Sequence, residues 1–288
     1  MSAVPPAWVA STTMSSFVLL WGSAALFIRW GLDYASPLAL LMLRFSLALV
    51  LLVLIGLPRR QWWPAAGTRW QVAWAGLVMI GGYALCYALA LDNGITPGLL
   101  ATLLGVQPIL TLLLTERQFP ARRLLGLCIS LGGLALVVLE SLLLTGLSVM
   151  GLVYALLALV GITAGSLMQK NIQQPPIQVL PLQYLVTLLL CVLFIPAMPL
   201  TVDWQPLFAA PLLWLVVVIS VVAQLLLYRM IRSGNLVNVT ALFYLVPVVT
   251  VLLDYLVFGN TLPALALVGM GAILGGLVLV FRAPPAAA

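Results

Sequence analysis

Long apolar runs, separated by short polar or glycine- and proline-rich connections, dominate the chain from residue 12 to residue 281. A helix that crosses a bilayer needs about 20 mostly apolar residues. The pattern therefore predicts an all-α membrane protein with ten transmembrane helices. These cover residues 12–31, 35–57, 70–91, 97–115, 123–139, 149–170, 178–198, 209–231, 236–257 and 263–281.

The composition supports a lipid environment and removes several function classes. Of the 288 residues, 64% are hydrophobic and 6% are charged, which is far more apolar than an ordinary soluble domain. The chain has no His, and its three cysteines lie apart in apolar runs. Metal sites, disulfides and His-dependent hydrolases are therefore not expected, and neither is a cofactor. The basic residues form no platform for nucleic acid.

The charges in the connections predict the topology. Ten basic residues follow even-numbered spans and one, Arg29, follows an odd-numbered span. Because cytoplasmic loops are rich in Lys and Arg, this predicts that both termini are cytoplasmic. The ten are Arg59, Arg60, Arg69, Arg117, Arg122, Arg123, Lys170, Arg229, Arg232 and Arg282.

The two halves of the sequence repeat one another. At a spacing of 139 residues, Pro37 matches Pro176 and Pro108 matches Pro247, while Arg44 falls on Gln183. At a spacing of 143 residues, Gly132-Gly133 matches Gly275-Gly276. Residues 1–145 and 146–288 would then each hold five spans, and an odd number turns the second half upside down. Inverted repeats are a common plan of secondary transporters.

The repeated segments also carry a family resemblance. Their residues are Trp21-Gly22, Pro37 with Arg44-Phe45, Gln107-Pro108, Glu116-Arg117, Gly126 and Gly132-Gly133. In this order and spacing they resemble the EamA type of the drug/metabolite transporter superfamily. Within it the chain looks most like the YddG-type exporters of aromatic and other hydrophobic amino acids. The second half departs from the pattern, with Gln183 at the Arg44 position and Asn260 near an expected Glu.

The resemblance implies a multi-pass protein of the bacterial inner membrane that is not an enzyme. It would export small amphipathic metabolites, with amino acids favoured, by alternating access and without ATP. The expected partners are this small-molecule substrate and the lipid bilayer, with a monomer as the working assumption.

Polar and aromatic residues on one face of several spans are candidates for the substrate site, because lipid would leave their polar atoms unpaired. Helix packing is the alternative for each of them. The candidates are Trp21, Tyr83, Tyr87, Gln107, Thr163, Ser166, Gln224, Tyr228 and Tyr244. On span three the helical period also places Met79 on the face of the two tyrosines.

Three further residues are structural or gating candidates. Arg44 lies too deep in span two to be a loop charge, so it should face the protein interior. It either binds a substrate carboxylate or ties span two to helix-end carbonyls or to an acid such as Asp254. Pro108 and Pro247 each remove a backbone donor, which predicts a kink or hinge in spans four and nine.

Two rival functions remain. An exporter of cationic drugs needs a buried carboxylate, for which Asp254 is the nearest candidate. A membrane-embedded enzyme is disfavoured because no pair of acids or Ser/Lys constellation falls on one mid-membrane face.

Overall fold

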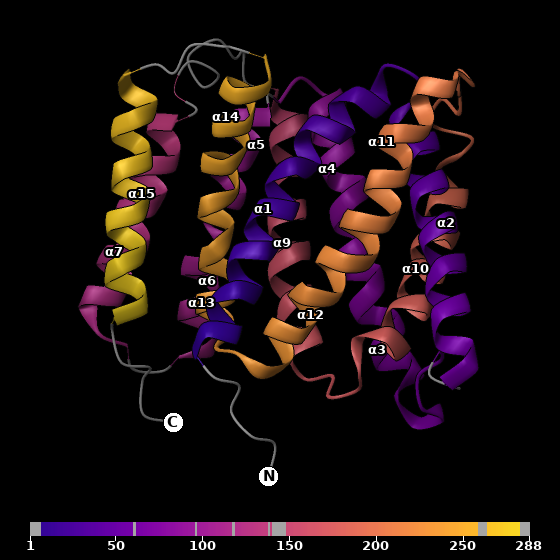
Figure 1. Ribbon diagram of the computed structural model, residues 1–288, viewed down its shortest axis with the longest axis horizontal. Helices are drawn as coiled ribbons and strands as arrows, with labels where there is room; N and C mark the ends of the chain where they lie inside the picture. Colours follow the sequence, from indigo (N-terminus) through magenta and orange to yellow (C-terminus); the bar gives the residue numbers. More distant parts are fainter. Residues whose placement is uncertain are drawn as a thin grey trace.

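The structure is a computed structural model that describes residues 7–59, 62–95, 97–116, 119–137, 139, 148–258 and 264–282. All regular elements in these ranges are helical, and the β structure found there is a single isolated bridge between Ala35 and Val202. Figure 1 shows the helices as one bundle.

The first half contains five helical segments. They are α1 (Ala7–Leu32), α2 (Pro37–Gly56), α3 (Arg69–Gly76) continuing through a π-helical stretch (Leu77–Gly82) into α4 (Tyr83–Asp92), α5 (Pro97–Leu104) followed by α6 (Gln107–Thr115), and α7 (Ala121–Val137). Gly94, with φ of +85°, makes the turn between α4 and α5, where only glycine adopts this backbone without strain.

The second half repeats this order. Its segments are α9 (Val149–Lys170), α10 (Pro176–Phe194), α11 (Ala209–Leu213) continuing through a π-helical stretch (Trp214–Ala223) into α12 (Gln224–Ser233), α13 (Leu236–Ala241) followed by a 3₁₀ turn (Leu242–Tyr244) and α14 (Leu245–Phe258), and α15 (Ala264–Arg282). The π-helical stretches of α3–α4 and α11–α12 stand in corresponding segments of the two halves.

Each predicted span coincides with one of these helical segments. Among the described residues, seven helical runs are long and apolar enough to cross a membrane, so the chain is a multi-pass membrane protein. The α5–α6 and α13–α14 segments are interrupted and α7 is short, and they do not meet the same length criterion. The total of ten crossings stays a prediction.

The two interruptions lie beside the prolines at which the sequence predicts kinks. A proline leaves the carbonyl four residues before it without its helical donor. For Pro108 that carbonyl belongs to Leu104, the last residue of α5, and for Pro247 it belongs to Phe243 in the 3₁₀ turn. A role of these breaks as hinges is untested and stays a prediction.

Both described ends of the chain lie at one end of the bundle, where α1 begins and α15 ends (Figure 1). The helix ends that carry Arg69, Arg122, Arg123, Lys170 and Arg232 gather there too, and we call it the arginine-rich end. The loops that hold Asp33 and Asp203 lie at the opposite end. Which end faces the cytoplasm remains the prediction made from the charges.

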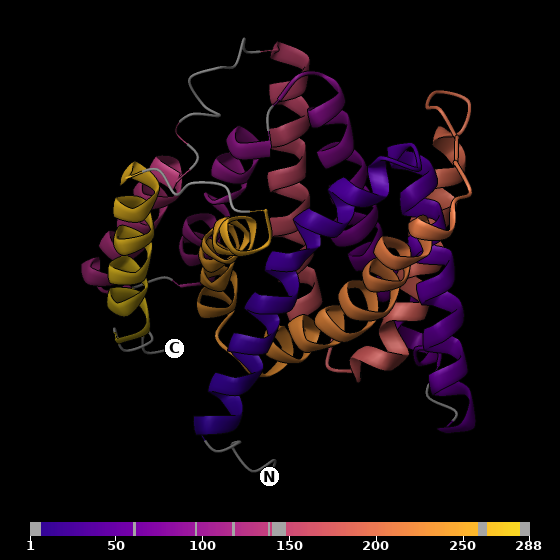
Figure 2. The ribbon, with the colours of Figure 1, turned by 45° about the horizontal axis from the view of Figure 1, so that its top comes forward.

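The halves touch closely where α7 meets α15, a pair that stands side by side in both views (Figures 1 and 2). A Cβ on Gly126 would lie 2.6 Å from the Gly276 carbonyl oxygen, and one on Gly133 would lie 2.6 Å from that of Gly269. Such short distances exclude any larger residue without a shift of the backbone. The order of these contacts shows that the two helices run antiparallel.

Several residues touch their own repeat counterparts across the two halves. The rings of Phe45 and Tyr184 lie 5.2 Å apart, centroid to centroid. The Tyr244 hydroxyl donates to the Gly105 carbonyl at 2.5 Å, and these residues are 139 positions apart. The Ser130 hydroxyl donates to the Ile273 carbonyl, 143 positions away. Both separations equal the spacings of the sequence repeat.

Candidate functional site

Arg44 lies inside the protein and joins the two halves. Its Nε donates to the Ser220 hydroxyl at 2.6 Å, and its guanidinium carbon lies 5.3 Å from the centre of the Phe45 ring. The charge also interacts with Tyr83 and Tyr184. The side chain is surrounded by protein and only partly exposed, so it faces the protein interior.

The π-helical stretch of the second half shapes this region. π-Helical turns are rare and often occur at functional sites because they interrupt the regular hydrogen bonds of an α-helix. Ser220 lies within this stretch, and its backbone carbonyl accepts a hydrogen bond from the Tyr184 hydroxyl. Ser220 therefore accepts one hydrogen bond from Arg44 at its hydroxyl and another from Tyr184 at its backbone carbonyl.

Tyr83 and Tyr87 accompany Arg44. They stand one turn apart on α4, directly after the π-helical stretch of the first half, with their ring centroids 5.8 Å apart and edge to face. Both are enclosed but half-accessible, as Arg44 is. The structure thus brings together a guanidinium and two tyrosines that retain accessible surface.

Trp21 lies in a different aromatic group. Its ring packs against Phe17 at 5.2 Å and against Phe243 at 5.7 Å, and it is half-buried. Phe243 belongs to the 3₁₀ turn that interrupts α13 and α14. Trp21 therefore contacts the broken segment of the opposite half, and no ring contact among the described residues joins it to Tyr83.

The polar candidates on α6 and α9 are buried and paired. The Gln107 amide donates to the Ser166 hydroxyl at 3.3 Å, which links the two helices. Thr163 and Ser166 donate to carbonyls one turn earlier in α9, both at 2.7 Å. Pro108, next to Gln107, is buried as well. In this conformation these side chains serve helix packing.

The candidates of the second half are equally buried. The Tyr228 hydroxyl donates to Gln183 Oε1 at 2.7 Å, and Gln183 Nε2 donates to Gln169 Oε1 at 2.9 Å and to the Val72 carbonyl at 3.3 Å. Gln224 is buried one turn before Tyr228, and Tyr244 is buried with its hydroxyl on Gly105. Substrate contact by any of the nine candidates stays a prediction.

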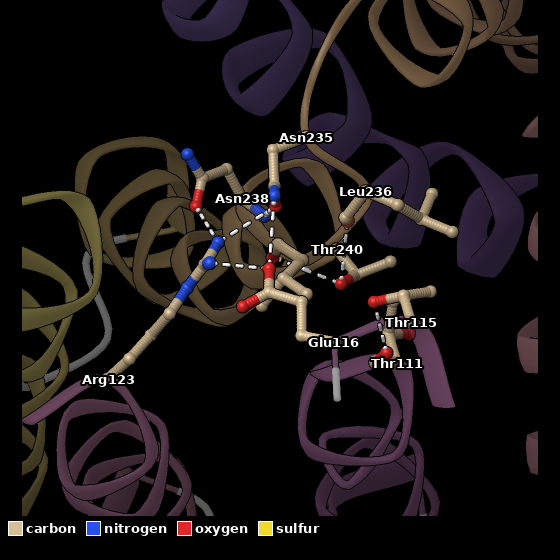
Figure 3. A network of polar contacts seen from close by, with 9 residues as sticks. Thr111, Thr115, Glu116, Arg123, Asn235, Leu236, Asn238 and Thr240 are labelled. Carbon is tan, nitrogen blue, oxygen red and sulfur yellow. Dashed lines mark hydrogen bonds and ion pairs between the residues drawn. The ribbon is translucent and has the colours of Figure 1, made fainter. Parts of the chain in front are cut away.

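A polar cluster that the sequence did not predict lies at the arginine-rich end. Arg123 Nη1 lies 2.5 Å from Glu116 Oε1, and its Nη2 donates to Asn235 Oδ1 at 2.8 Å and to Asn238 Oδ1 at 2.6 Å (Figure 3). Asn235 Nδ2 donates back to Glu116 Oε1 at 3.1 Å. We call these four residues the Arg123 cluster.

Three helix ends build the Arg123 cluster. Glu116 follows α6 directly, Arg123 lies in the first turn of α7, and Asn235 caps the N-terminus of α13 by accepting from the Asn238 N–H. Arg123 is only 1% exposed. A cation in the first turn of a helix opposes the helix dipole, and this was the one sequence signal that could have drawn attention to it.

No group of three or more potential metal ligands, from His, Cys, Asp and Glu, occurs in the described part of the chain. Arg44 supplies a positive charge with donors, and Tyr83 and Tyr87 supply aromatic surface and hydroxyls.

Comparisons with known proteins agree with this fold. A solved crystal structure of a protein is similar over 94% of this chain and 97% of that chain, with a TM-score of 0.78 and 18% sequence identity. At this identity the likeness concerns the fold alone. No curated protein sequence matches. The family model of the EamA-like transporters matches twice, over residues 10–139 and 149–282, which together span most of the chain. The chain therefore belongs to the EamA-like transporter family.

Proposed function

We propose that this transporter carries small zwitterions with an apolar body, above all amino acids with aromatic or other hydrophobic side chains, and exports them by alternating access. The observation that carries the proposal is the half-accessible Arg44 beside Tyr83. The family supplies the coarser statement, a membrane transporter of small molecules.

The charge of Arg44 argues for a carboxylate. Taking a guanidinium out of water is costly unless an anion and hydrogen bonds compensate it. The described side chains contain one ion pair, between Arg123 and Glu116, and Arg44 has the neutral Ser220 hydroxyl instead. A substrate carboxylate could complete the compensation through charge-assisted hydrogen bonds. The same positive charge disfavours a cationic drug at this place.

The tyrosines argue for an apolar or aromatic body. Small-ligand sites are mostly apolar with a few placed polar groups. Tyr83 and Tyr87 offer ring faces for the substrate side chain, and their hydroxyls and rings can receive its ammonium group.

The contacts between repeat counterparts support an inverted arrangement of residues 1–145 and 146–288. A residue that touches its own counterpart, as Phe45 touches Tyr184, lies at the axis relating the halves. Because α7 and its counterpart α15 run antiparallel, that axis would cross the helices. Two such halves can exchange which side of a central site is open.

Uptake by purified protein in liposomes tests the proposal. Phenylalanine should be transported, whereas phenethylamine, which has the same ring without the carboxylate, should not. A cationic dye serves as the third substrate. Transport of phenethylamine or the dye at the rate of phenylalanine would refute the assignment of the carboxylate to Arg44.

A further inference from the structure

We propose that the Arg123 cluster is a one-sided latch, a set of positioning residues that holds the arginine-rich end closed and separates once in each transport cycle. This rests on the proposed function, because it assumes that the two halves move against each other. The substrate does not touch the latch. Its residues act by setting which side of the Arg44 site is open.

The Arg123 cluster connects the two halves. Glu116 and Arg123 belong to the first half, and Asn235 and Asn238 belong to the second. Figure 3 shows the side chains of α13 and of the α6–α7 connection pointing toward one another. The arginine-rich end cannot open between α6–α7 and α13 while these contacts persist.

Other contacts between the halves occur at both ends and so favour neither. At the arginine-rich end, Gln174 accepts from the Ala65 N–H at 2.9 Å. At the opposite end, Ser36 donates to the Pro199 carbonyl at 2.8 Å and accepts from the Thr201 N–H at 3.1 Å. Ser36 and Gln174 lie in corresponding loops of the repeat, as do their partners. The loop contact at one end of the bundle is therefore the repeat counterpart of the loop contacts at the other end.

The latch has no such match in the sequence. At the repeat spacings, Glu116, Arg123, Asn235 and Asn238 correspond to Tyr255, Ala266, Thr96 and Leu99, and Asn260 stands near the position where a second Glu would be expected. These four residue types cannot form an ion pair bridged by amides. An interaction present in one conformation and absent from the other shifts the population toward the first. The resting carrier should therefore keep its arginine-rich end closed.

The Arg123 cluster is also incompletely satisfied. Glu116 Oε2 and Arg123 Nε are buried and have no hydrogen-bond partner. A buried ion pair contributes little net stability when its desolvation is poorly compensated, but it can still specify one arrangement. Such a contact fits a latch that must open repeatedly better than it fits a permanent clamp.

Cysteine accessibility tests the latch without any substrate. In a background with Cys86, Cys128 and Cys191 replaced by serine, one cysteine is placed at Thr240, which is 1% exposed and lies beside the Arg123 cluster in Figure 3. The rate of its reaction with a small methanethiosulfonate reagent reports opening of the arginine-rich end. A second background carries the cysteine at Tyr83 and is treated with a membrane-impermeant reagent applied only at the opposite end, so its rate reports access from that end.

Arg123→Gln should raise the reaction rate at position 240 at least about tenfold, the change expected when a minor open state becomes common. It should lower the rate at position 83, because opening one end closes the other. Asn238→Ala removes one acceptor but keeps the ion pair, so it should shift both rates in the same directions by less. Arg123→Lys should restore part of the parent behaviour.

Arg122→Gln is the matched control, because Arg122 is adjacent and exposed, and both of its rates should equal those of the parent. Parent rates at both positions in Arg123→Gln and Asn238→Ala would overturn the latch. So would a joint rise at positions 240 and 83, which would mean general loosening. Failure of phenylalanine transport would refute the proposed substrate and leave these labelling results standing.

Discussion

Arg44 and Gln183 stand at matching positions of α2 and α10, each directly before an aromatic residue that contacts its counterpart in the other half. Their surroundings differ. Arg44 is half-accessible and its one described hydrogen bond goes to Ser220, whereas Gln183 is 0% exposed and bonded to Tyr228, Gln169 and the Val72 carbonyl. The two halves therefore share the backbone arrangement but differ at this position, which is partly exposed in the first half and fully packed in the second.

The packing around Gln183 explains why its position is closed. A Cβ on Gly76 would lie 2.5 Å from the Gln183 side chain, so α3 and α10 are in direct contact. The oxygen and the nitrogen of the Gln183 amide are both hydrogen-bonded to neighbouring residues, which leaves no room for a ligand.

The largest expected effect comes from placing an arginine at the matching position of both halves. Gln183→Arg would bury a charge where the described neighbours provide no acid, and we expect the free energy of unfolding to fall by about 3–5 kcal/mol. Thermal unfolding and gel filtration in detergent would measure this. Gln173→Arg, at an exposed loop position, is the matched control. Parent stability in Gln183→Arg would show that the Gln183 position is open as well.

The reverse exchange should affect binding instead of folding. Arg44→Gln should unfold at nearly the parent temperature but bind phenylalanine about 10- to 100-fold more weakly, since a hydrogen bond to a charged group is worth about 1.5–3 kcal/mol. Ligand-induced shifts of the unfolding temperature would measure the affinity. Arg122→Gln, which also removes an arginine, should bind as the parent does. Unchanged affinity in Arg44→Gln would assign Arg44 a purely structural role.

Truncating an accessible tyrosine should discriminate between substrates. Tyr83→Ala removes ring area from the proposed substrate site, and aromatic contact is worth about 0.5–1.5 kcal/mol beyond burial of its area, so phenylalanine should bind several-fold more weakly. Alanine, with little side chain to place there, should be affected less. Competition for phenylalanine uptake in liposomes would measure both affinities. Equal losses for the two amino acids would indicate a folding defect.

The smallest effect concerns the packed side of the comparison. Tyr228→Phe keeps the ring and removes the hydrogen bond to Gln183, which should lower the free energy of unfolding by about 1 kcal/mol. Affinity for phenylalanine should stay at the parent value. A changed affinity at parent stability would move Tyr228 into the substrate site.

Helix placement could be read from the apolar runs, because the length of a crossing helix is fixed by the bilayer. The π-helical stretch Leu77–Gly82 could not, since its residues are apolar in either helix type. Met79 is buried against Gly165 of α9, and the Tyr83 backbone lies against Gly161 of the same helix.

The interior position of Arg44 was predictable because a charge deep in a span cannot face lipid at low cost. Its partner Ser220 lies 176 residues away and carries no signal of the pairing. For Arg123, by contrast, the sequence did not predict an interior position. Among ten basic residues that mark one side of the membrane, sequence alone treats it as one more loop charge. Its burial arises only where α13 meets the α6–α7 connection.

The glycine contacts between α7 and α15 also matter for how the protein is made. Gly126 and Gly133 leave the ribosome long before Gly269 and Gly276, the glycines whose carbonyls they meet. Until α15 is inserted, this face of α7 lacks the helix that covers it in the folded protein. Because α15 is synthesised after α7, it completes a contact for which α7 already carries the small residues. In a chain that stops before residue 264, the glycine face of α7 stays uncovered in the membrane. This uncovered face distinguishes the truncated chain from one that contains α15.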